Sequence, residues 1–501
     1  MKKNVFVLAI CCILACALYG EAEAKDRLIV ADQYDATTMD PVAHNDVPSG
    51  RACLSVYDTL IFLDPETGEF KPGLAESWEF LSGAEFKMHL RKGVRFHNGE
   101  EMKADDVRFS LMRATTPAGA RVAAYSKNIA DVEVLDDYTV IIRLKAADYS
   151  FFPSLTHNWT SILNRKAVEA AGENYGMNPV GTGPFKFVSW QKGDRYVLER
   201  FDDYWGPKIN FKTLEVRSIP EPTNRMIELE TGGVDIAYPL AANDLRRVEE
   251  HERLDLIRQP QTSVHYLGFN FAKKPLDDVR VRRAISLALD TEGIDKVVWR
   301  GVGRVPRSLI PLPVRYSIDS EISPHAQDVE TAKKLLAEAG VKGLKLQVWT
   351  NERKERIDMA TIIQAQLQEV GIDVEIKILE WGALLKGLRE KAHDLFIMGW
   401  VSSIPDPNFS VVGLLETGAG SNYFSCSDPK MDEFLAKGRS LPDSEERAAI
   451  YRDMQLYINE QTPMVYLHSD DALVGTQKYV KGFIAGAGDN HSFRKVRLET
   501  E

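Results

Sequence analysis

Two segments of the chain gather side chains that could hold a small polar molecule. Residues 350–356 include five consecutive charged side chains, from Glu352 to Arg356, and residues 400–408 read WVSSIPDPN. Charged side chains bind ionic groups of a ligand, and Trp400 offers a large flat apolar face. The two segments therefore predict ligand binding. For the first segment, an ordinary solvated run of charge is an equally open interpretation.

The sequence contains none of the local signatures that mark the common catalytic sites. It has no GxSxG nucleophile elbow, no HExxH zinc motif and no GxGxxG dinucleotide loop. No two of the ten histidines lie four residues apart, as a metal-binding pair on a helix would. We therefore predict no catalytic residue, no metal and no cofactor. A secreted hydrolase is kept as an alternative without support from a motif.

The elements around the two segments predict how they are positioned. Apolar patterns predict strands over residues 344–349, 372–378 and 394–399, with helices over 357–370 and about 381–391 between them. This βαβαβ order favours a parallel sheet covered by helices, an α/β fold. Because ligands bind beyond the carboxyl ends of such strands, we expect both segments to frame one pocket.

The rest of the chain predicts further elements and more than one domain. A strand is expected over 27–31, a helix over about 48–60, and hairpins between 73 and about 178, with a clear one at 134–142. Two glycines and a proline in GTGPF, residues 181–185, indicate a chain reversal or a domain crossing. A helix over about 444–460 and a strand over 464–467 follow. The length of 501 residues exceeds a single core, so two or three domains are expected.

The N-terminus has the three parts of a secretory signal peptide. Lys2 and Lys3 precede an apolar run, and Ala22-Glu23-Ala24 offers a cleavage site, so the mature chain is expected to begin at Lys25. The alternative is a lipid anchor at Cys16, which follows an imperfect lipoprotein pattern. Only Cys53 and Cys426 lie beyond the signal, and either a disulfide or two free thiols is possible for them. The net charge of −11 argues against nucleic acid and anionic membranes as partners.

Residues 73–111 carry a resemblance to one protein family. They read GLAESWEFLSGAEFKMHLRKGVRFHNGEEMKADDVRFSL, and GTGPF at 181–185 and DVRVRRAI at 278–285 match the same family. The chain is similar to the extracytoplasmic solute-binding proteins of dipeptide, oligopeptide and nickel ABC importers, family 5. Glu380-Trp381-Gly382 and His393-Asp394 look most like its dipeptide branch.

The resemblance implies a two-lobed periplasmic-binding-protein fold with a ligand cleft and a hinge. It implies a discontinuous first domain (25–64, 180–268 and 473–501), an inserted second domain (65–179) and a third domain (269–472). A periplasmic monomer of this kind binds a peptide or peptide-like solute and delivers it to membrane permease subunits. A sensory protein of the same fold, which presents its ligand to a receptor, is a second interpretation.

The resemblance also implies a set of ligand-binding positions. Trp381, Gly399 and Trp400 are expected to line the pocket, with Asn270 near them, and Arg353 or Arg356 to bind a carboxylate. Ser403 stands where peptide-binding relatives carry an aspartate for the ligand's ammonium, and a hydroxyl supplies no countercharge. Either Asp406 replaces that aspartate, or the ligand has no ammonium there, as in a blocked peptide, an opine, a glycoside or a metal chelate.

Overall fold

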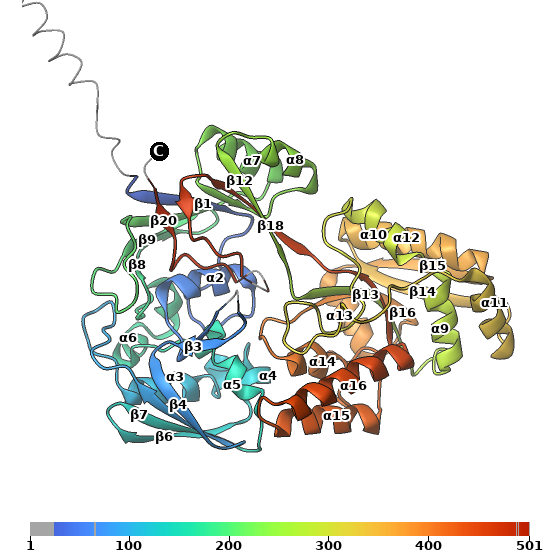
Figure 1. Cartoon of the computed structure of the whole chain (residues 1–501), viewed down its shortest axis with the longest axis horizontal. Helices are drawn as coiled ribbons and strands as arrows, with labels where there is room; N and C mark the ends of the chain where they lie inside the picture. The colour runs from blue at the N-terminus through green and yellow to red at the C-terminus, as the bar shows by residue number, and fades with distance from the viewer. Residues whose placement is uncertain (1–24, 65–66, 487, 489, 500–501) are drawn as a thin grey trace, which may run out of the picture.

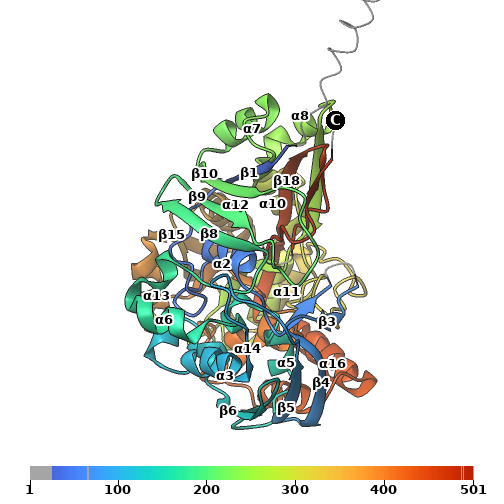
Figure 2. The ribbon, with the colours of Figure 1, turned by 90° about the vertical axis from the view of Figure 1, so that its left-hand side faces the viewer.

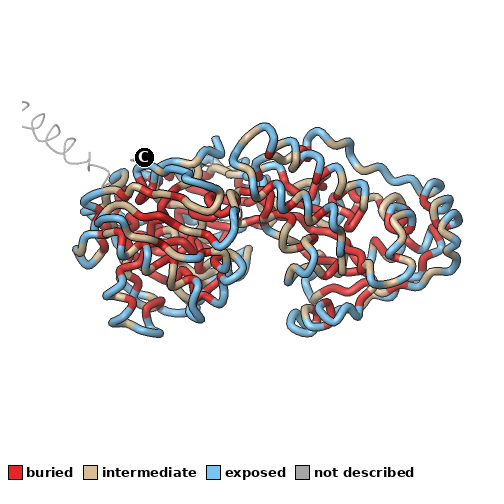
Figure 3. Tube along the Cα trace, turned by 90° about the horizontal axis from the view of Figure 1, so that it is seen from below, coloured by how far each residue is buried: buried red, intermediate tan, exposed pale blue. Residues whose placement is uncertain are grey.

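The computed structural model describes residues 25–64, 67–486, 488 and 490–499, which form two lobes (Figure 1). The predicted signal segment, including Cys16, lies outside these residues. Two large sheets organise the lobes, one of seven strands and one of five, and a four-stranded sheet lies below the first (Figure 2). Buried chain is concentrated inside each lobe (Figure 3). The two-lobed α/β architecture agrees with the expectation from the sequence.

The seven-stranded sheet has the order β12-β18-β11-β1-β10-β9-β8. Its centre is β1 (Arg27–Asp32), which runs parallel to β10 (Thr213–Ser218) and to β11 (Ile236–Tyr238). The outer strands pair antiparallel and are β8 (Phe185–Gln191), β9 (Arg195–Arg200), β12 (Leu254–Pro260) and β18 (Asp471–Gln477). The short strands β19 (Val480–Lys481) and β20 (Arg497–Leu498) pair beside it.

Helix α2 (Val47–Val56) is shorter than the helix expected over about 48–60. Asp46 caps its first turn by accepting a hydrogen bond from Ser49 N at 2.9 Å. The helix ends early because the carbonyls of Thr59 and Leu60 accept hydrogen bonds from residues 73–75, next to the pair β2 (Ile61–Leu63) and β3 (Phe70–Pro72). The other helices of this part are α7 (Pro222–Thr231) and α8 (Leu245–Glu249).

The four-stranded sheet is built on the stretch that carries the family resemblance and lies in the segment predicted as an inserted domain. Strands β4 (Ala75–Ser82), β5 (Glu85–Leu90), β7 (Thr139–Leu144) and β6 (Ile129–Asp136) form an antiparallel sheet in that order, and α3 (Ala104–Arg113) packs beside it. Shorter helices α4 (Ala123–Ser126), α5 (Phe151–Ser154) and α6 (Arg165–Ala171) follow. The predicted meander and the hairpin at 134–142 are confirmed.

The GTGPF segment joins the inserted domain to β8 and has a structural role. A Cβ on Gly181 would lie 2.1 Å from the carbonyl oxygen of Val56, and a Cβ on Gly183 would lie 2.6 Å from its carbonyl carbon. The His97 ring also hydrogen-bonds the Gly183 carbonyl at 3.0 Å. The glycines are therefore needed for close backbone packing, and a domain crossing at this segment stays a prediction.

The five-stranded sheet has the order β15-β14-β16-β13-β17. Strands β14 (Leu344–Asn351), β15 (Ile372–Leu379) and β16 (Leu395–Val401) are parallel, as predicted. Strands β13 (Ser263–Phe269) and β17 (Met464–His468) add to it antiparallel. One face packs on α9 (Val279–Ala288), α10 (Thr291–Trp299), α11 (Val329–Glu338) and α12 (Lys354–Glu369). The other packs on α13 (Trp381–Arg389), α14 (Pro407–Leu415), α15 (Pro429–Ser440) and α16 (Glu445–Gln461).

Two short connections join the large sheets. Residues 261–262 lead from β12 into β13, and residues 469–470 lead from β17 into β18. The connections lie side by side, since Gln261 N donates to the Asp470 carbonyl at 2.9 Å. Strand β13 therefore belongs to the second sheet, although the boundary expected after residue 268 placed it with the first domain.

Two further points of the sequence analysis can be compared with the fold. Cys53 and Cys426 are both free thiols, so of the two open possibilities the structure has no disulfide between them. Cys53 lies in α2 of the first lobe and Cys426 precedes α15 of the second.

Within the described residues, no helix combines the length and the apolar character that crossing a bilayer requires.

Candidate functional site

The carboxyl ends of β14 and β16 form the edge where the sequence predicts a pocket. Both predicted loops are shorter than expected, because β14 continues to Asn351 and α12 begins at Lys354, while β16 continues to Val401 and α14 begins at Pro407. Arg356 thus lies in the first turn of α12. Since β14 and β16 are parallel neighbours, both loops leave the same edge of the sheet. This edge adjoins the connections between the lobes, because Ser402 N donates to the Thr262 carbonyl at 3.0 Å.

Arg356 is a buried cation without an acidic partner. Its residue is 7% exposed, and Nη1 donates to Asn351 Oδ1 at 3.1 Å. Among the residues that the structure describes, Nε has no hydrogen-bond acceptor and no carboxylate lies within ion-pair distance. Burial lowers the pKa of Arg356 to about 10, and repulsion by Arg353 acts in the same direction. A buried unpaired guanidinium is unfavourable in the empty protein and suits an anionic ligand.

The two tryptophans predicted to line the pocket differ in what their rings contact. Trp381 is 45% exposed at the start of α13, and the Arg356 guanidinium lies 5.9 Å from its ring centroid. Trp400 is half-buried, donates Nε1–H to the Phe409 carbonyl at 3.0 Å, and lies so close to Gly413 that a Cβ there would be 2.7 Å from its ring. Trp381 therefore keeps an open face beside Arg356, while Trp400 is packed on α14.

The predicted partners of a ligand's ammonium are in different situations. Asp406 is 2% exposed, accepts from Asn408 N at 3.0 Å as the N-cap of α14, and forms an ion pair with Arg447 Nη2 at 2.8 Å. Its charge is already neutralised inside the second lobe. Ser403 is half-buried, and its Cα lies 3.5 Å from the position of a Cβ on Gly488 of the first lobe. Ser403 thus lies against the first lobe.

The two remaining predicted residues stand apart from this group. Arg353 is exposed and pairs with Glu355 at 3.0 Å. Asn270 is fully buried just after β13, at the opposite end of that strand from the connections. Its Nδ2 donates to the carbonyls of His393 at 2.8 Å and Lys391 at 3.2 Å, and its Oδ1 accepts from Ala272 N. We therefore leave Asn270 out of the proposed site.

One residue that the sequence analysis did not select lies in the group. His265 on β13 pairs directly with Gly399 on β16. The point that a Cβ on Gly399 would occupy lies 3.0 Å from His265 Nδ1 and 3.5 Å from Arg356 Nη2. The sequence contained a signal, because His265 is the one ionisable base in the otherwise uncharged strand SVHYLGF. A role for His265 in binding can be inferred only from its proximity to Arg356, which is remote in sequence.

The lobes also touch on the side away from the connections. Tyr149 N donates to the Arg439 carbonyl at 2.8 Å, and Asn408 Nδ2 donates to Ser150 Oγ at 3.3 Å. The rings of Tyr125 and Phe409 lie 5.9 Å apart. The lobes therefore touch in two places: at the connections, next to the edge that carries Arg356, Gly399 and Ser403, and on the side away from the connections. Groups of both lobes can then enclose a ligand.

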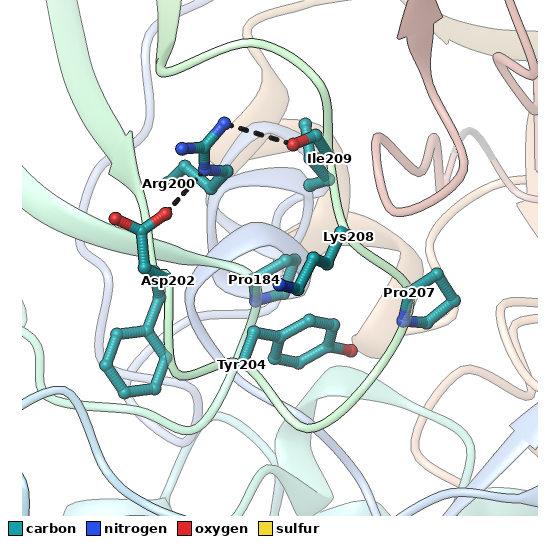
Figure 4. Close-up of a pocket in the computed structure, with 8 residues that line it drawn as sticks. Pro184, Arg200, Asp202, Tyr204, Pro207, Lys208 and Ile209 are labelled. Atoms are coloured by element: carbon teal, nitrogen blue, oxygen red, sulfur yellow. Dashed lines mark hydrogen bonds and ion pairs between the residues drawn. The ribbon is translucent and has the colours of Figure 1, made fainter.

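A separate depression of about 370 Å³ lies inside the first lobe, around the segment between β9 and β10 (Figure 4). Two of its charged lining residues are paired, since Arg200 donates to Asp202 at 2.7 Å and to the Ile209 carbonyl at 3.2 Å, and the third, Lys208, is exposed to solvent. None of its lining residues belongs to the second sheet or to the connections. We therefore do not assign the function to it. No cluster of three or more potential metal ligands occurs among the described residues.

Comparisons with known proteins give relatives over most of the chain. The sequence model described as "Bacterial extracellular solute-binding proteins, family 5 Middle" matches residues 69–422. The dipeptide-binding protein of Escherichia coli is 32% identical over 480 residues, which is 89% of each chain.

Two solved structures are also similar. One is a periplasmic binding protein of Helicobacter pylori in complex with the peptide STSA, at 30% identity and a TM-score of 0.81, covering 96% of this chain and 99% of that one. The other, from Agrobacterium tumefaciens, is a periplasmic binding protein in complex with agropinic acid, at 25% identity and a TM-score of 0.79, covering 95% and 100%.

Proposed function

Since the chain belongs to the bacterial extracellular solute-binding proteins of family 5, we propose that it binds a peptide or peptide-like solute between its lobes and delivers it to the permease of an ABC importer. The dipeptide-binding relative in Escherichia coli and the peptide complex from Helicobacter pylori support this substrate class. The fold supports the mode of action, because two short connections let the lobes move about a hinge.

The single observation that carries the proposal is the unpaired guanidinium of Arg356. The carboxylate at the end of a peptide is the group that this cation lacks. A hydrogen bond to a charged group contributes about 1.5–3 kcal/mol, and burial of Arg356 shields the contact from water. The open face of Trp381 then packs on the part of the ligand next to its carboxylate.

The other end of the ligand favours a second candidate substrate class. Asp406 is held by Arg447, and the Ser403 hydroxyl supplies no charge, so neither offers a free carboxylate to an ammonium. This arrangement favours a solute that carries a carboxylate but no ammonium at that place. The complex of an Agrobacterium relative with agropinic acid shows that a protein of this fold binds such a compound class. An opine-like acid or a blocked peptide is therefore the second candidate.

The cellular role follows from the family and from the N-terminal sequence. Its members are named as extracellular solute-binding proteins. We propose export to the periplasm with a cleaved signal, the alternative being a lipid anchor at Cys16, and a monomer that contacts the permease only when transport occurs. We propose no catalytic activity. A sensory role predicts binding without uptake, so a transport assay with labelled ligand separates it from import.

A matched set of ligands tests the proposal. Met-Leu, N-acetyl-Met-Leu and Met-Leu amide differ only in the ammonium or the carboxylate, and native mass spectrometry identifies any compound that co-purifies. Isothermal titration should show binding of Met-Leu or of the acetylated form, and none of the amide. Equal binding of the amide, or co-purification of a ligand without an acidic group, would contradict the role of Arg356. An Arg280→Gln variant is the control, since this exposed arginine of α9 in the same lobe already pairs with Asp278.

A further inference from the structure

His265 lies between the proposed ligand site and the connections that join the lobes. It is the third residue of β13, and it is 4% exposed. On one side its Nε2 lies 2.9 Å from Asp470 Oδ2, in the connection between β17 and β18. On the other side its Nδ1 has no hydrogen-bond partner among the described residues. Nε2 of this imidazole is therefore held by Asp470 in the hinge, while the buried Nδ1 has no hydrogen-bond partner among the described residues.

The hinge side of His265 is a continuous polar network. Asp470 also accepts from Ser263 Oγ at 2.7 Å and lies 3.3 Å from His468 Nε2. His468 Nδ1 lies 2.6 Å from Asp295 Oδ1, and the Trp299 ring stacks on His468 at 3.7 Å between centroids. Burial alone would raise the pKa of Asp470, but attraction by His265 and His468 outweighs it and holds that pKa well below 3.8. Asp470 is thus a fixed anion that accepts Nε2–H of His265.

The Nδ1 side of His265 lies next to Gly399 and Arg356. Both His265 Nδ1 and Arg356 Nη2 lie within 3.5 Å of the point that a Cβ on Gly399 would occupy. A larger residue at position 399 would fill this space, so glycine leaves the two nitrogens facing the same small volume. Arg356 Nε is also without a partner among the described residues. Two buried side chains from different elements therefore bring His265 Nδ1 and Arg356 Nη2 to one place at the carboxyl edge of the sheet.

The protonation of His265 decides what that place can bind. With Nε2–H donated to Asp470, the neutral ring presents a lone pair at Nδ1, which repels an anion. A proton on Nδ1 turns it into a charged donor that can share a carboxylate with Arg356. The charged groups around the ring are Asp470 and His468 on the hinge side and Arg356 and Arg353 on the ligand side. Trp299 packs against its face at 5.7 Å.

We propose that His265 is a second anion-binding group beside Arg356, that it takes up a proton from solvent when the ligand's carboxylate binds, and that the resulting imidazolium links the bound ligand to Asp470 in the hinge. This inference rests on the proposed function, because the carboxylate belongs to the ligand bound at Arg356. Ligand binding is then coupled to the uptake of a proton, and the bound ligand is linked through His265 to the connection between the lobes.

The direction of the pH dependence follows. Burial lowers the pKa of His265 below its ordinary value of 6.5 in the empty protein, although Asp470 acts in the opposite direction, so the ring is neutral at pH 7. A carboxylate at Nδ1 raises the pKa of the bound state, since an opposite charge favours the charged form. Between these two pKa values, binding consumes up to one proton. Affinity then rises by as much as about tenfold for each pH unit of acidification.

Isothermal titration from pH 8 to pH 6, in buffers of different ionisation enthalpy, measures this proton directly. The probes are Met-Leu, N-acetyl-Met-Leu and, as the carboxylate alone, acetate at up to about 0.1 M. We expect Kd to fall with pH and the binding heat to depend on the buffer. His265→Gln, which can still donate to Asp470, should remove both effects. His89→Gln, at a partly exposed histidine of the inserted domain, should leave both unchanged.

A measurement on the unaltered protein tests the inference even if the His265→Gln variant does not fold. With ¹⁵N-labelled histidine, the Nδ1 signal of His265 should move from a lone-pair to a protonated position at pH 7 when a probe is added. A binding probe whose Kd is constant from pH 6 to pH 8, with an unchanged Nδ1 signal, overturns the inference and leaves the proposed function intact. If no probe binds, no acid co-purifies and Nδ1 never responds, both the proposed function and the inference fail.

Discussion

Two buried arginines of the second lobe have opposite surroundings. Arg447 on α16 is 4% exposed and pairs with Asp406, whereas Arg356 on α12 is 7% exposed and has no acidic partner among the described residues. Burial acts to lower the pKa of Arg447, but Asp406 outweighs it and raises that pKa, while the pKa of Arg356 falls to about 10. Arg447 thus holds two elements of the lobe together, whereas the surroundings of Arg356 fit the ligand-binding role that we propose for it. Burial alone does not identify a binding site; the missing partner does.

Removing the charge of Asp406 should have the largest effect on stability. In Asp406→Asn the buried Arg447 loses its ion pair, and breaking such a pair costs about 3–5 kcal/mol of unfolding free energy. Chemical denaturation measures this loss. The double variant Asp406→Asn, Arg447→Met should recover part of it, because no charge is then left buried. Glu433→Gln, at an exposed position of α15 that pairs with Lys437, is the control and should leave stability nearly unchanged.

The same change at the other arginine should act on affinity instead. Arg356→Gln removes the proposed carboxylate partner, so ligand affinity should fall by about 1.5–3 kcal/mol, or roughly 10- to 150-fold. Stability should stay the same or increase, since an unpaired buried charge is removed. Titration and denaturation of one preparation test both parts. A loss of stability as large as that of Asp406→Asn would show that Arg356 is a structural residue, and the contrast between the arginines would disappear.

Much of this architecture could be predicted from the sequence, and the contrast between the arginines could not. The periodicity of residues 344–399 gave the parallel strands and the shared edge, because side-chain pattern and strand direction are local properties. Arg356 was selected as a candidate by its position after β14. That Asp406 pairs with Arg447 depends on a contact across 41 residues of sequence, which no local pattern encodes. The surroundings of Asn270 and His265 likewise depend on residues remote in sequence: Asn270 donates to the carbonyls of residues 391 and 393, and His265 lies near Arg356. For this reason Asn270 was selected from the sequence and His265 was not.

Ser403→Asp supplies the countercharge that neither Ser403 nor Asp406 offers. If Ser403 faces the other end of a peptide, affinity for Met-Leu should increase by up to about 1.5–3 kcal/mol, while affinity for N-acetyl-Met-Leu should fall or stay the same. Comparison of the two ligands in one titration series isolates the ammonium. Equal changes for both would place residue 403 away from the ligand's amino end. Ser427→Asp, at an exposed position just before α15 in the same lobe, controls for an added charge.

The distinction between buried bases with and without an acidic partner among the described residues also applies to His468, on β17, and His393, just before β16. Burial would lower the pKa of His468, but hydrogen bonds to Asp295 and Asp470 outweigh it and raise that pKa above 6.5. Burial lowers the pKa of His393 to about 4. His468 therefore contributes stability that is fully present below pH 6.5 and is lost as pH rises through its raised pKa. His393 contributes stability that is present above pH 6.5 and is lost as pH falls toward 4.

Two glutamine variants test this pair. His468→Gln should lose more unfolding free energy at pH 6 than at pH 9, because only the protonated His468 ring is stabilised by Asp295 and Asp470. His393→Gln should instead diminish the loss of stability between pH 6.5 and pH 4. Denaturant melts at these pH values measure both. Parallel pH profiles for the two variants would contradict the assigned partners.

The smallest expected effect concerns Trp381, whose open face distinguishes the surroundings of Arg356 from those of Arg447. Trp381→Ala removes the ring that lies 5.9 Å from the Arg356 guanidinium, so affinity should fall by about 0.5–1.5 kcal/mol. Stability should change little, because 45% of this residue is exposed. Trp381→Phe keeps an aromatic face and should retain most of the affinity. If both variants bind as the unaltered protein does, the ligand does not reach α13, and the carboxylate site is limited to Arg356 and the strand edge beside it.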